Sequence, residues 1–410
     1  MPNTTLVLFT SSYPYGNGEQ FLETELPYLS DTFSKIVIIP LEVKTGDIPR
    51  ELADNCNSYP VQSYPRKHLM IRILGVCRSS WFWSEVVSHP RDFLRLFEIG
   101  LIMRSLMNQY GSALKFLEND ASETILYSYW FGGHAMAIAA LAKKNKVTRL
   151  VARAHRYDLY EQFNKKGYHP FKRFLLTSFN KLCPISIDGE NYLKEKYPDM
   201  PTTDIATYKL GVVIPKKSKA YVANIGPIVI VSCSGIRPIK NVEKIAQSMR
   251  HLGMLCPDIV INWIHFGDGD HSIKNNIEKI VNDFSDNTTA HFKGNVSNPE
   301  VLEYYSTNDV FLFINLSSSE GIPVSIMEAN SRSIPALATL TGGVGEIVNE
   351  HNGIPVPTSI SATQVAIKIK ELIDKDDYVY GQMRESAYDK VNEEYNATVN
   401  YPKFINEVLT

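Results

Sequence analysis

The sequence has few cysteines and no long apolar run, and these absences narrow the classes of protein that it can encode. Its five cysteines, at positions 56, 77, 183, 233 and 256, are scattered and include no C-x-x-C pair. We therefore expect neither a disulfide framework nor a zinc site. No uncharged apolar stretch approaches the roughly 18 residues of a membrane-spanning helix. The first residues lack the basic region and apolar core of a secretory signal, so we expect a cytoplasmic protein.

The chain also lacks an excess of either charge. Its 42 Lys and Arg residues nearly balance its 44 Asp and Glu residues, and the formal net charge at pH 7 is −2. This balance gives no reason to expect nucleic acid as a partner. With 410 residues, of which 44% are hydrophobic and 21% charged, the chain is typical of a globular protein. That length predicts two domains of about 200 residues each.

One segment combines a predicted buried strand, a polar turn and the start of a helix. The strand is the apolar run at residues 310–314, and Pro323 suits a first helical turn because its missing N–H is not needed there. Free N–H groups at a helix start attract phosphate. Glu320 in the turn and Glu328 on the helix can reach different parts of one elongated ligand, such as a sugar nucleotide. Alternatively, they are a helix-start carboxylate and a solvated carboxylate without a ligand.

Strands and helices alternate along both halves of the chain. In the first half, predicted strands cover Leu6–Phe9, Lys35–Pro40, Thr124–Tyr127 and Arg149–Ala154, and the last predicted helix covers Asp188–Tyr197. The second half has predicted strands from Ile228, over Ile261–Phe266 and from Ala290, and helices over residues 362–374 and 381–409. Residues 208–227 have little periodicity and predict a linker. The alternation predicts an α/β protein with two doubly wound domains facing each other across a cleft.

The segment from Glu320 to Ala329 resembles the motif of retaining glycosyltransferases of family 4, which have the GT-B fold. It contains Glu, Gly, a hydrophobic residue and Pro, then Glu-Ala, and residues 334–348 continue the resemblance. Ser331 and Ser333 depart from it, because the family usually has small residues and Gly there. The resemblance implies two Rossmann-like domains and a crossing helix: an acceptor-binding domain at 1–210, a nucleotide-sugar-binding domain at 211–390, and a last segment, 391–410, that returns to the first domain.

The same resemblance implies a donor site in the second half. Arg237 and Lys240, a basic pair three residues apart, would bind the diphosphate, although solvated surface bases are the alternative. Glu320 would bind hydroxyls of the donor sugar, with a catalytic role, and Glu328 would bind those of the ribose. The other donor-binding candidates in this half are Gly321, Ile322, Val324, Ser325, Gly294 and Val296.

Candidate residues also follow three predicted strands in the first half, where such folds bind ligands. Gly16 and Gly18 form either a plain turn or the glycine loop that many family members present to the donor phosphates or the acceptor. His155 and Asp158 match a His-x-x-Asp position of the family's acceptor domain. His155 is therefore a catalytic candidate, and Asp158 and His134 are candidates on the acceptor or sugar side. Each histidine could instead be a packed or capping residue.

Asp268-Gly-Asp270 has the spacing of a metal-binding D-x-D motif, but it resembles the G-x-G turn that GT-B enzymes carry after this strand. We therefore expect no metal and no cofactor. Arg237, Lys240 and the N–H groups at the start of the predicted helix would neutralise the departing diphosphate. No carboxylate is assigned as a covalent nucleophile, so the donor phosphate would act as the base for front-face attack by the acceptor.

These expectations describe a retaining, metal-independent glycosyltransferase of the hexosyltransferase class. It would move a sugar from a UDP- or GDP-linked donor to a hydroxyl of a glycan or lipid-linked acceptor. The N-terminal glycine loop resembles that of bacterial enzymes of surface-polysaccharide assembly. Two alternatives remain: a nucleotide-sugar epimerase of the same fold, which needs no acceptor, and a non-catalytic scaffold that binds nucleotide without turnover.

Residues 66–104 alternate basic residues with apolar and aromatic ones. The bases are Arg66, Lys67, Arg72, Arg78, Arg91, Arg95 and Arg104. One interpretation is a helical surface that rests on anionic lipid at the inner face of the membrane. The other is a pair of amphipathic helices that cover the sheet.

Overall fold

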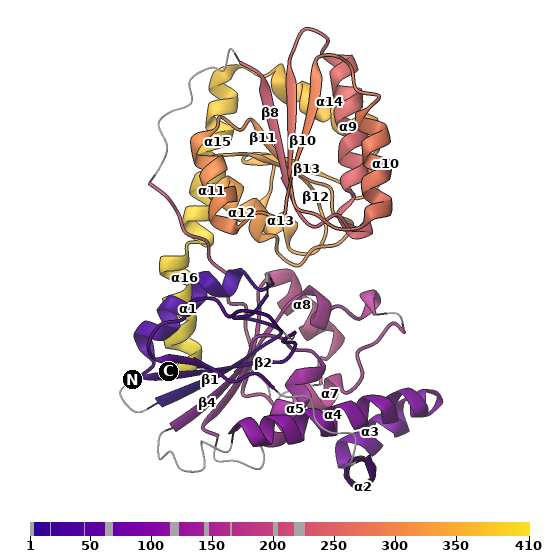
Figure 1. Cartoon of the computed structure of the whole chain (residues 1–410), viewed down its shortest axis with the longest axis vertical. Coiled ribbons are helices and arrows are strands. Elements are labelled where there is room, and N and C mark those ends of the chain that lie inside the picture. Colours follow the sequence, from indigo (N-terminus) through magenta and orange to yellow (C-terminus); the bar gives the residue numbers. More distant parts are fainter. Residues whose placement is uncertain are drawn as a thin grey trace. The chain divides into compact units, whose positions relative to one another are not determined.

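The structure is a computed structural model that describes residues 4–16, 18–44, 46–61, 69–114, 123–142, 147–164, 166–199, 204–216 and 226–410. Two of the predicted basic residues, Arg66 and Lys67, and part of the predicted linker lie outside these ranges. The chain divides into two compact units (Figure 1). Unit 1 comprises Met1–Lys209 with Tyr401–Thr410, and unit 2 comprises Leu210–Asn400.

Unit 1 is built on a parallel sheet with the strand order β3-β2-β1-β4-β5-β6-β7. The strands are β1 (Thr4–Thr10), β2 (Lys35–Pro40), β3 (Cys56–Ser58), β4 (Glu123–Ser128), β5 (Arg149–Ala154), β6 (Lys181–Pro184) and β7 (Asp204–Ile205). In the central register, Leu6 pairs with Ile36 on one side and with Ile125 on the other. The strand order reverses at β1, so the gap between β1 and β4 is the switch point at which such sheets bind ligands.

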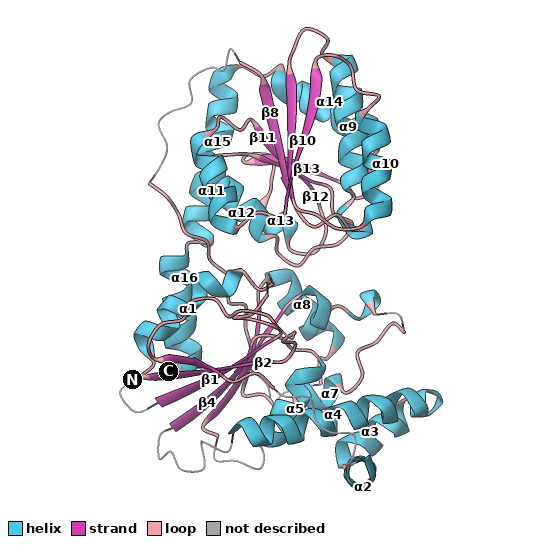
Figure 2. Cartoon of the chain, in the orientation of Figure 1, coloured by secondary structure: helices cyan, strands magenta, loops and turns pink. Residues whose placement is uncertain are grey.

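Helices cover both faces of this sheet (Figure 2). They are α1 (Phe21–Thr32), α2 (Leu69–Cys77), α3 (Ser80–Ser88), α4 (Phe93–Ala113), α5 (Gly133–Ala142), α6 (Arg156–Leu159), α7 (Lys172–Leu176) and α8 (Ile187–Lys196). Side chains alternate along a strand, so Val7 and Phe9 pack into the core with α4, α5 and α7. Leu6 and Leu8 pack on the opposite face with α1. Burial of both faces explains why β1 is apolar over most of its length.

The C-terminal segment belongs to the second of these cores. Helix α16 (Ala397–Phe404) and a π-helical turn over Ile405–Leu409 add Phe404 and Leu409 to the cluster around α1. The guanidinium of Arg153, which is fully buried, lies 3.9 Å from the centroid of the Phe404 ring and 3.3 Å from the Glu25 carboxylate. Arg149 donates a hydrogen bond of 2.8 Å to the carbonyl of Val408. The end of the chain is therefore an integral part of unit 1.

Unit 2 repeats the topology of unit 1 with one strand fewer, in the order β10-β9-β8-β11-β12-β13. The strands are β8 (Ile228–Cys233), β9 (Ile261–Phe266), β10 (Thr288–Gly294), β11 (Leu312–Asn315), β12 (Ala336–Thr339) and β13 (Gly353–Val356). The helices are α9 (Val242–Leu255), α10 (His271–Val281), α11 (Asn298–Thr307), α12 (Val324–Asn330), α13 (Val344–Ile347), α14 (Ala362–Ile373) and α15 (Asp377–Glu394). In Figure 1, α9, α10 and α14 cover one face of the sheet and α11, α12 and α15 the other. The switch point of this unit lies between β8 and β11.

The structure confirms most of the predicted elements and corrects three of them. The helical stretch predicted over residues 381–409 is divided, because the chain breaks after α15 and the side chain of Asn396 accepts the N–H of Thr398 at the start of α16. The pair of helices predicted near residues 66–104 is three helices, α2 to α4. Pro323 lies just before α12 rather than in its first turn, with φ −80° and ψ 109°. Among the described residues, no helix is long and apolar enough to cross a bilayer.

Candidate functional site

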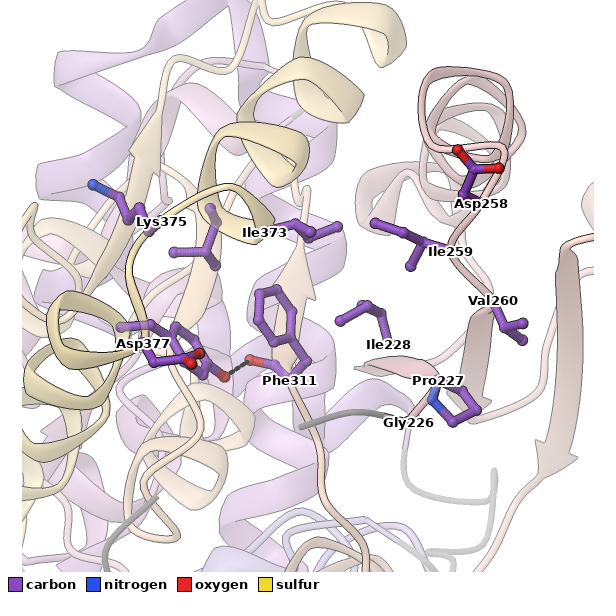
Figure 3. Close-up of a pocket in the computed structure, with 12 residues that line it drawn as sticks. Gly226, Pro227, Ile228, Asp258, Ile259, Val260, Phe311, Ile373, Lys375 and Asp377 are labelled. Carbon is purple, nitrogen blue, oxygen red and sulfur yellow. Dashed lines mark hydrogen bonds between the residues drawn. The ribbon is translucent and has the colours of Figure 1, made fainter. Parts of the chain in front are cut away.

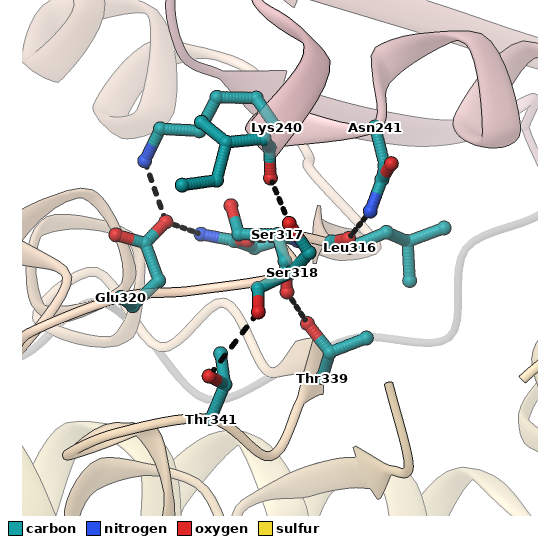
Figure 4. Close-up of polar contacts among 10 residues, drawn as sticks. Lys240, Asn241, Leu316, Ser317, Ser318, Glu320, Thr339 and Thr341 are labelled. Carbon is teal, nitrogen blue, oxygen red and sulfur yellow. Dashed lines mark hydrogen bonds and ion pairs between the residues drawn. The ribbon is translucent and has the colours of Figure 1, made fainter. Parts of the chain in front are cut away.

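Two loops meet at the carboxyl edge of the unit 2 sheet, on either side of its switch point. One follows β8 and contains a short 3-10 turn, Pro238–Lys240, and the other follows β11. The Ser318 N–H donates to the carbonyl of Ile239 at 2.8 Å, and the Asn241 side chain donates to the carbonyl of Leu316 at 2.8 Å (Figure 4). The sequence separates these loops by about 80 residues, but parallel pairing of β8 with β11 brings their ends together.

An ion pair joins two of the four predicted catalytic residues at this junction. The ammonium of Lys240 lies 2.6 Å from Oε1 of Glu320 (Figure 4). The Lys240 side chain is 27% exposed and the Glu320 side chain 11%, so the pair is shielded from much of the solvent. The side-chain amide of Asn315, at the end of β11, donates to the same Glu320 oxygen at 3.4 Å. The structure thus brings Lys240 and Glu320 together as the sequence predicts, and leaves an ammonium charge at the sheet edge.

Arg237 lies directly before the Pro238–Lys240 turn and is exposed. It lines a small cavity of about 220 Å³ together with Asn241 and Lys244 at the start of α9. Asn241 has a φ of 50°, in the left-handed region that asparagine tolerates better than most residues. This conformation turns the chain into α9 while its side chain holds the β11 loop. Sequence reasoning assigned no role to Asn241, whose turn preference was the available signal.

The turn around Glu320 depends on a glycine further along the chain. Gly342 has a φ of 53°, and a Cβ there would lie 2.1 Å from the carbonyl oxygen of Glu320. Gly343 donates its N–H to the carbonyl of Gly321 at 2.7 Å. Thr341 donates to the carbonyl of Ser318 (Figure 4). Gly342 and Gly343, in the segment that continued the family resemblance, therefore pack against the Glu320 turn and support it. The sequence alone did not indicate this contact.

Glu328 lies on α12, the helix that follows this turn. The side-chain amide of Asn298, at the start of α11, donates to Oε1 of Glu328 at 2.7 Å. Burial raises the pKa of Glu328 from 4.5 to about 7, although the Asn298 hydrogen bond and the nearby charge of Arg332 lower it. Burial also raises the pKa of Cys233, at the end of β8, to about 12, and the charge of Glu328 adds to that increase. Glu328 is therefore close to the end of the switch-point strand.

The remaining donor candidates of unit 2 lie around these two carboxylates. Gly321 and Ile322 continue the Glu320 turn, and Val324 and Ser325 are the first residues of α12, where N–H groups have no intrahelical partner. Helix α12 has only seven residues, so its dipole is short. The other two candidates, Gly294 and Val296, end β10 and precede Asn298, so their loop adjoins the Glu328 contact.

Ser331 and Ser333, which depart from the family pattern, are accommodated at the end of α12. Ser331 is fully buried and donates to the carbonyl of Glu328 at 2.8 Å. Ser333 has a φ of 59°, a conformation that a glycine adopts at lower cost. Ser333 in place of glycine therefore raises the local backbone free energy. Glu328 keeps its position on α12.

The Gly267-Asp268-Gly269-Asp270 turn has structural roles for both glycines. A Cβ on Gly267 would lie 2.0 Å from the carbonyl oxygen of Ser234, and one on Gly269 would lie 2.2 Å from that of Ile236. The turn therefore packs directly against the loop that carries Arg237, and only glycine permits that approach. These contacts support its interpretation as a glycine turn.

The two aspartates of that turn have protein partners. Asp268 accepts the ammonium of Lys274 at 2.8 Å, and this bond lowers the pKa of Asp268. Asp270 caps α10, because its carboxylate accepts the N–H groups of Ser272 at 2.8 Å and Ile273 at 3.2 Å. Each aspartate thus stabilises the local turn or helix.

In unit 1, His155 and Asp158 lie where β5 ends and α6 begins. The Asp158 carboxylate accepts the N–H of Phe131 at 2.5 Å and the N–H of His155 at 2.6 Å, so it ties the end of β4 to the end of β5. Burial raises the pKa of Asp158 to about 6, against the opposing charge of Lys172. Burial lowers the pKa of His155 to about 3, which keeps its imidazole neutral. Asp158 therefore holds the ends of β4 and β5 together, and His155 lies beside it.

The other three candidates of unit 1 lie in separate surroundings. His134 begins α5 next to the hydroxyl of Tyr110 on α4, 3.4 Å from its Nδ1, and burial lowers its pKa to about 4. Gly16, with a φ of 64°, and Gly18 both accept hydrogen bonds from the guanidinium of Arg50, at 2.6 and 2.9 Å. Whether these residues contact a substrate stays a prediction.

A second cavity lies at the opposite edge of the unit 2 sheet. Its volume is about 420 Å³, and its lining includes Ile228 at the start of β8, Val260 before β9 and Phe311 before β11 (Figure 3). Ligands of doubly wound sheets bind at the carboxyl ends of the strands, whereas this cavity lies at their amino ends. It is therefore not the candidate site, although it is larger than the cavity beside Arg237.

The comparisons with known proteins agree with this geometry. Residues 213–390 match the family model Glycosyl transferases group 1. The matched residues lie within unit 2. They include every candidate donor residue of unit 2, from Arg237 to Glu328.

Relatives of this chain are named for surface-polysaccharide biosynthesis. It is 32% identical over 111 residues to the O-antigen biosynthesis glycosyltransferase WbnH of Escherichia coli, covering 27% of this chain and 29% of that protein. It is 23% identical over 276 residues to the putative colanic acid biosynthesis glycosyltransferase WcaL of Escherichia coli K12, covering 66% of each. The chain thus matches under a third of the length of WbnH and just under two thirds of WcaL. These relatives confirm the predicted resemblance to such enzymes.

Solved structures confirm the GT-B fold class. Sucrose-phosphate synthase of Thermosynechococcus elongatus superposes with a TM-score of 0.71 at 12% identity, covering 98% of both chains. Anabaena HepE in complex with UDP and glucose superposes with a TM-score of 0.62 at 14% identity, covering 99% of both chains. At these identities the likeness shows the fold alone.

The raised pKa of Glu328 leads to a prediction about pH. The folded protein holds this proton more tightly than the unfolded chain, so ionising Glu328 opposes folding as the pH rises from about 4.5 to 7. A ligand hydroxyl donates to the ionised form. We therefore expect the affinity for UDP, relative to that of a Glu328→Gln variant, to rise about tenfold between pH 6 and pH 8.

Calorimetric titration of both proteins at pH 6, 7 and 8 measures this ratio. The ionisation of UDP itself is common to both proteins and cancels in the comparison. Parallel affinity profiles for the wild type and the variant would contradict the assignment of Glu328 as a titrating ligand contact.

Proposed function

We propose that the protein is a retaining glycosyltransferase that moves a sugar from a nucleotide sugar to an acceptor hydroxyl without a metal ion. The observation that carries this proposal is the meeting of the Lys240 and Glu320 loops at the switch point of a group 1 glycosyltransferase domain. That site combines a basic pair, two carboxylates and glycine turns that let backbone approach a ligand. A sugar nucleotide has the matching groups: a diphosphate, a sugar and a ribose.

The donor binds in this proposal along the carboxyl edge of the unit 2 sheet. Arg237 supplies a planar guanidinium for phosphate oxygens, and Lys240 supplies a point charge. Glu328 accepts ribose hydroxyls and Glu320 accepts sugar hydroxyls. Anabaena HepE was solved with UDP and with UDP-glucose, which favours a UDP-linked hexose over a GDP-linked one here.

Charge stabilisation comes from the protein in this mechanism. Negative charge develops on the diphosphate as the glycosidic bond breaks, and Arg237 and Lys240 stabilise it in the transition state. Glu320 holds Lys240 in place before the donor arrives, because their ion pair measures 2.6 Å. The acceptor hydroxyl attacks from the face that the leaving group vacates, and a donor phosphate oxygen takes its proton. The configuration of the sugar is then retained.

The acceptor in this proposal is a glycan or a lipid-linked glycan bound by unit 1. The relatives' roles in O-antigen and colanic acid biosynthesis support a surface polysaccharide as the product. His155 is kept neutral by burial and serves as a hydrogen-bonding group near the reacting sugar. The protein would then work on the cytoplasmic side, where nucleotide sugars are available.

The direct test is turnover of labelled UDP- and GDP-sugars, with and without a lipid-linked glycan acceptor and with EDTA present. We expect transfer only with the acceptor, retention of the anomeric configuration and no loss in EDTA. A changed sugar on free nucleotide without acceptor would identify an epimerase. Binding without turnover would identify a scaffold, and loss in EDTA with rescue by Mn²⁺ would overturn the metal-independent mechanism.

Two substitutions and a matched control belong to the same assay. Arg237→Ala and Lys240→Ala should each lower kcat by roughly 10²–10³, because these groups act on charge that develops in the transition state. Lys279→Ala, an exposed lysine on α10, should leave kcat unchanged. Near-normal turnover in both site variants would contradict the role of the basic pair.

We also propose that helices α2 to α4 contact an anionic membrane surface. Helix α2 buries only Val76 among its side chains, while Met70 and Ile71 are 74% and 62% exposed. Leu94, at the start of α4, is 80% exposed, and Arg91 beside it is exposed as well. An exposed apolar ridge flanked by guanidinium groups suits the boundary between headgroups and acyl chains.

The structure assigns a packing role to two of the predicted bases. Arg104 donates to the carbonyl of Gly75 and to the hydroxyl of Ser79, which joins α4 to α2. Arg95 donates to the side chain of Asn164 at 3.2 Å. Helix α4 therefore covers the core, as the packing interpretation predicts, and the membrane proposal rests on the exposed side of α2 and the start of α4.

Flotation with vesicles tests the membrane contact. The wild type should float with vesicles that contain phosphatidylglycerol and detach as salt rises, because screening weakens the charge attraction. The double variant Met70→Glu/Ile71→Glu should lose most of this binding, and Ile367→Glu, an exposed apolar position on α14, should not. Equal recovery with neutral and anionic vesicles, or no effect of the double variant, would contradict the proposal.

A further inference from the structure

A carboxylate fills the backbone of the loop that follows β1. Oε1 of Glu19 accepts the N–H of Ser11 at 2.8 Å, and Oε2 accepts those of Ser12 at 2.7 Å and Tyr13 at 2.8 Å. A fourth donor comes from the end of β4, where the indole N–H of Trp130 lies 2.6 Å from Oε1. Consecutive backbone N–H groups of this kind form an anion-binding nest. In this chain the nest of Ser11, Ser12 and Tyr13 holds the chain's own glutamate, which is 8% exposed.

The backbone conformation of Glu19 indicates that this position requires the glutamate side chain. Its φ is 54°, in the left-handed region that costs free energy for any residue with a Cβ. Glycine would adopt this conformation at lower cost, and the same loop uses glycine at positions 16 and 18. A strained residue persists where its surroundings fix it, and such residues gather at functional sites.

The filled nest changes what the loop can bind. A donor phosphate could reach the N–H groups of Ser11, Ser12 and Tyr13 only by expelling the Glu19 carboxylate, and like charges would oppose its approach. Arg50 occupies the carbonyls of Gly16 and Gly18 on the other side of the loop. Glu19 and Arg50 thus occupy the polar backbone groups of the loop. The loop differs from a glycine loop that presents free N–H groups to phosphate.

Glu19 also holds the ring of Trp130 in place at the unit 1 switch point. Trp130 is partly exposed between Tyr129 and Phe131, which are fully buried, and its N–H is used by Glu19. The Trp130 ring centroid lies 4.4 Å from that of His155. His155 is 7% exposed, and both of its ring nitrogens are buried. The partly exposed Trp130 ring therefore supplies the contact surface, and an apolar ring face matches the C–H face of a sugar ring.

We propose that Glu19 is a positioning residue that holds Trp130 as a stacking surface for a sugar ring next to His155, while excluding phosphate from the β1 loop. This inference rests on the proposed glycosyl transfer, because it needs a sugar in unit 1. The sugar ring could come from the acceptor or from the donor, and the two sources are separated by the ligands in the experiment below.

The first experiment measures how much the contact between Glu19 and the nest stabilises the protein, and it does not require enzyme activity. Glu19→Ala should melt roughly 5 °C or more below the wild type, because three backbone N–H groups lose their acceptor. Formate, a small carboxylate, should refill the nest and raise the melting temperature of this variant saturably, whereas chloride at equal ionic strength should not. Formate should not change the melting temperature of the wild type or of Glu23→Ala. Glu23 is a partly exposed glutamate on α1 that pairs with Arg50.

Two results of that experiment would overturn the nest assignment. One is a Glu19→Ala variant that melts like the wild type, and the other is a formate response equal in all three proteins. Should Glu19→Ala fail to fold, Glu19→Gln keeps one acceptor oxygen, and its melting temperature should fall between those of the wild type and the alanine variant.

The second experiment measures binding by calorimetry with UDP, UDP-glucose, UDP-galactose and a short O-antigen oligosaccharide. Trp130→Ala should weaken a sugar-bearing ligand at least tenfold, the nucleotide sugar if the ring is the donor's and the oligosaccharide if it is the acceptor's. Glu19→Gln and Trp130→Phe, which keeps a ring without the N–H, should weaken the same ligand by a smaller factor. The affinity for UDP should stay unchanged in all three variants.

The outcomes of the binding experiment separate this inference from the proposed function. A change in UDP affinity of tenfold or more in Glu19→Gln would show that the β1 loop takes part in nucleotide binding and would overturn the exclusion of phosphate. Unchanged affinity for every sugar-bearing ligand in Trp130→Ala would overturn the stacking surface. Absence of sugar transfer by the wild type would contradict the proposed function alone, because neither the melting nor the binding measurement depends on turnover.

Discussion

The ion pair between Lys240 and Glu320 is the interaction on which the candidate donor site depends. It joins the loop after β8 to the turn after β11, at 2.6 Å and largely shielded from solvent. Asn315, Asn241 and Gly342 hold the same two loops from other sides. Removing either charged partner would leave the other partly buried and unpaired, which costs more than the pair itself contributes. The pair therefore keeps the Lys240 ammonium and the Glu320 carboxylate, the candidate contacts for phosphate and sugar, next to each other at the sheet edge.

The two units use one topology for different tasks. Each has a sheet whose strand order reverses beside its central strand, and in each the polar residues follow the carboxyl ends of the strands at that point. In unit 2 the loop after the central strand carries exposed or partly exposed bases, which suits phosphate. In unit 1 the corresponding loop is filled by Glu19 and bordered by Trp130, which suits a neutral ring. In the proposed function, the same edge of the fold serves as an anion site in unit 2 and as a sugar site in unit 1, depending on whether its backbone donors are already occupied.

Much of this fold could be predicted from the sequence, because long apolar runs such as Ile261–Phe266 give clear strand boundaries. The glutamates of the donor site were also predictable, since their spacing resembles a known motif. Short elements such as β3 and β7 were missed, because two or three residues carry no periodicity. Glu19 and Asn298 were missed for another reason: their partners lie 111 and 30 residues away, and no local pattern records such a contact.

The most direct test of the central claim is calorimetric titration of UDP into Glu328→Ala and Glu320→Ala beside the wild type. The account places the nucleotide on Glu328 and the sugar on Glu320. Loss of a charge-assisted bond to ribose should weaken UDP binding by roughly 1.5–3 kcal/mol, or about 10- to 150-fold, in Glu328→Ala. Glu320→Ala should bind UDP within about threefold of the wild type, because its carboxylate addresses a sugar that UDP lacks and the diphosphate itself pairs with the Lys240 ammonium that the substitution leaves free. Strong loss of UDP affinity in Glu320→Ala with none in Glu328→Ala, or no loss in either, would contradict the account.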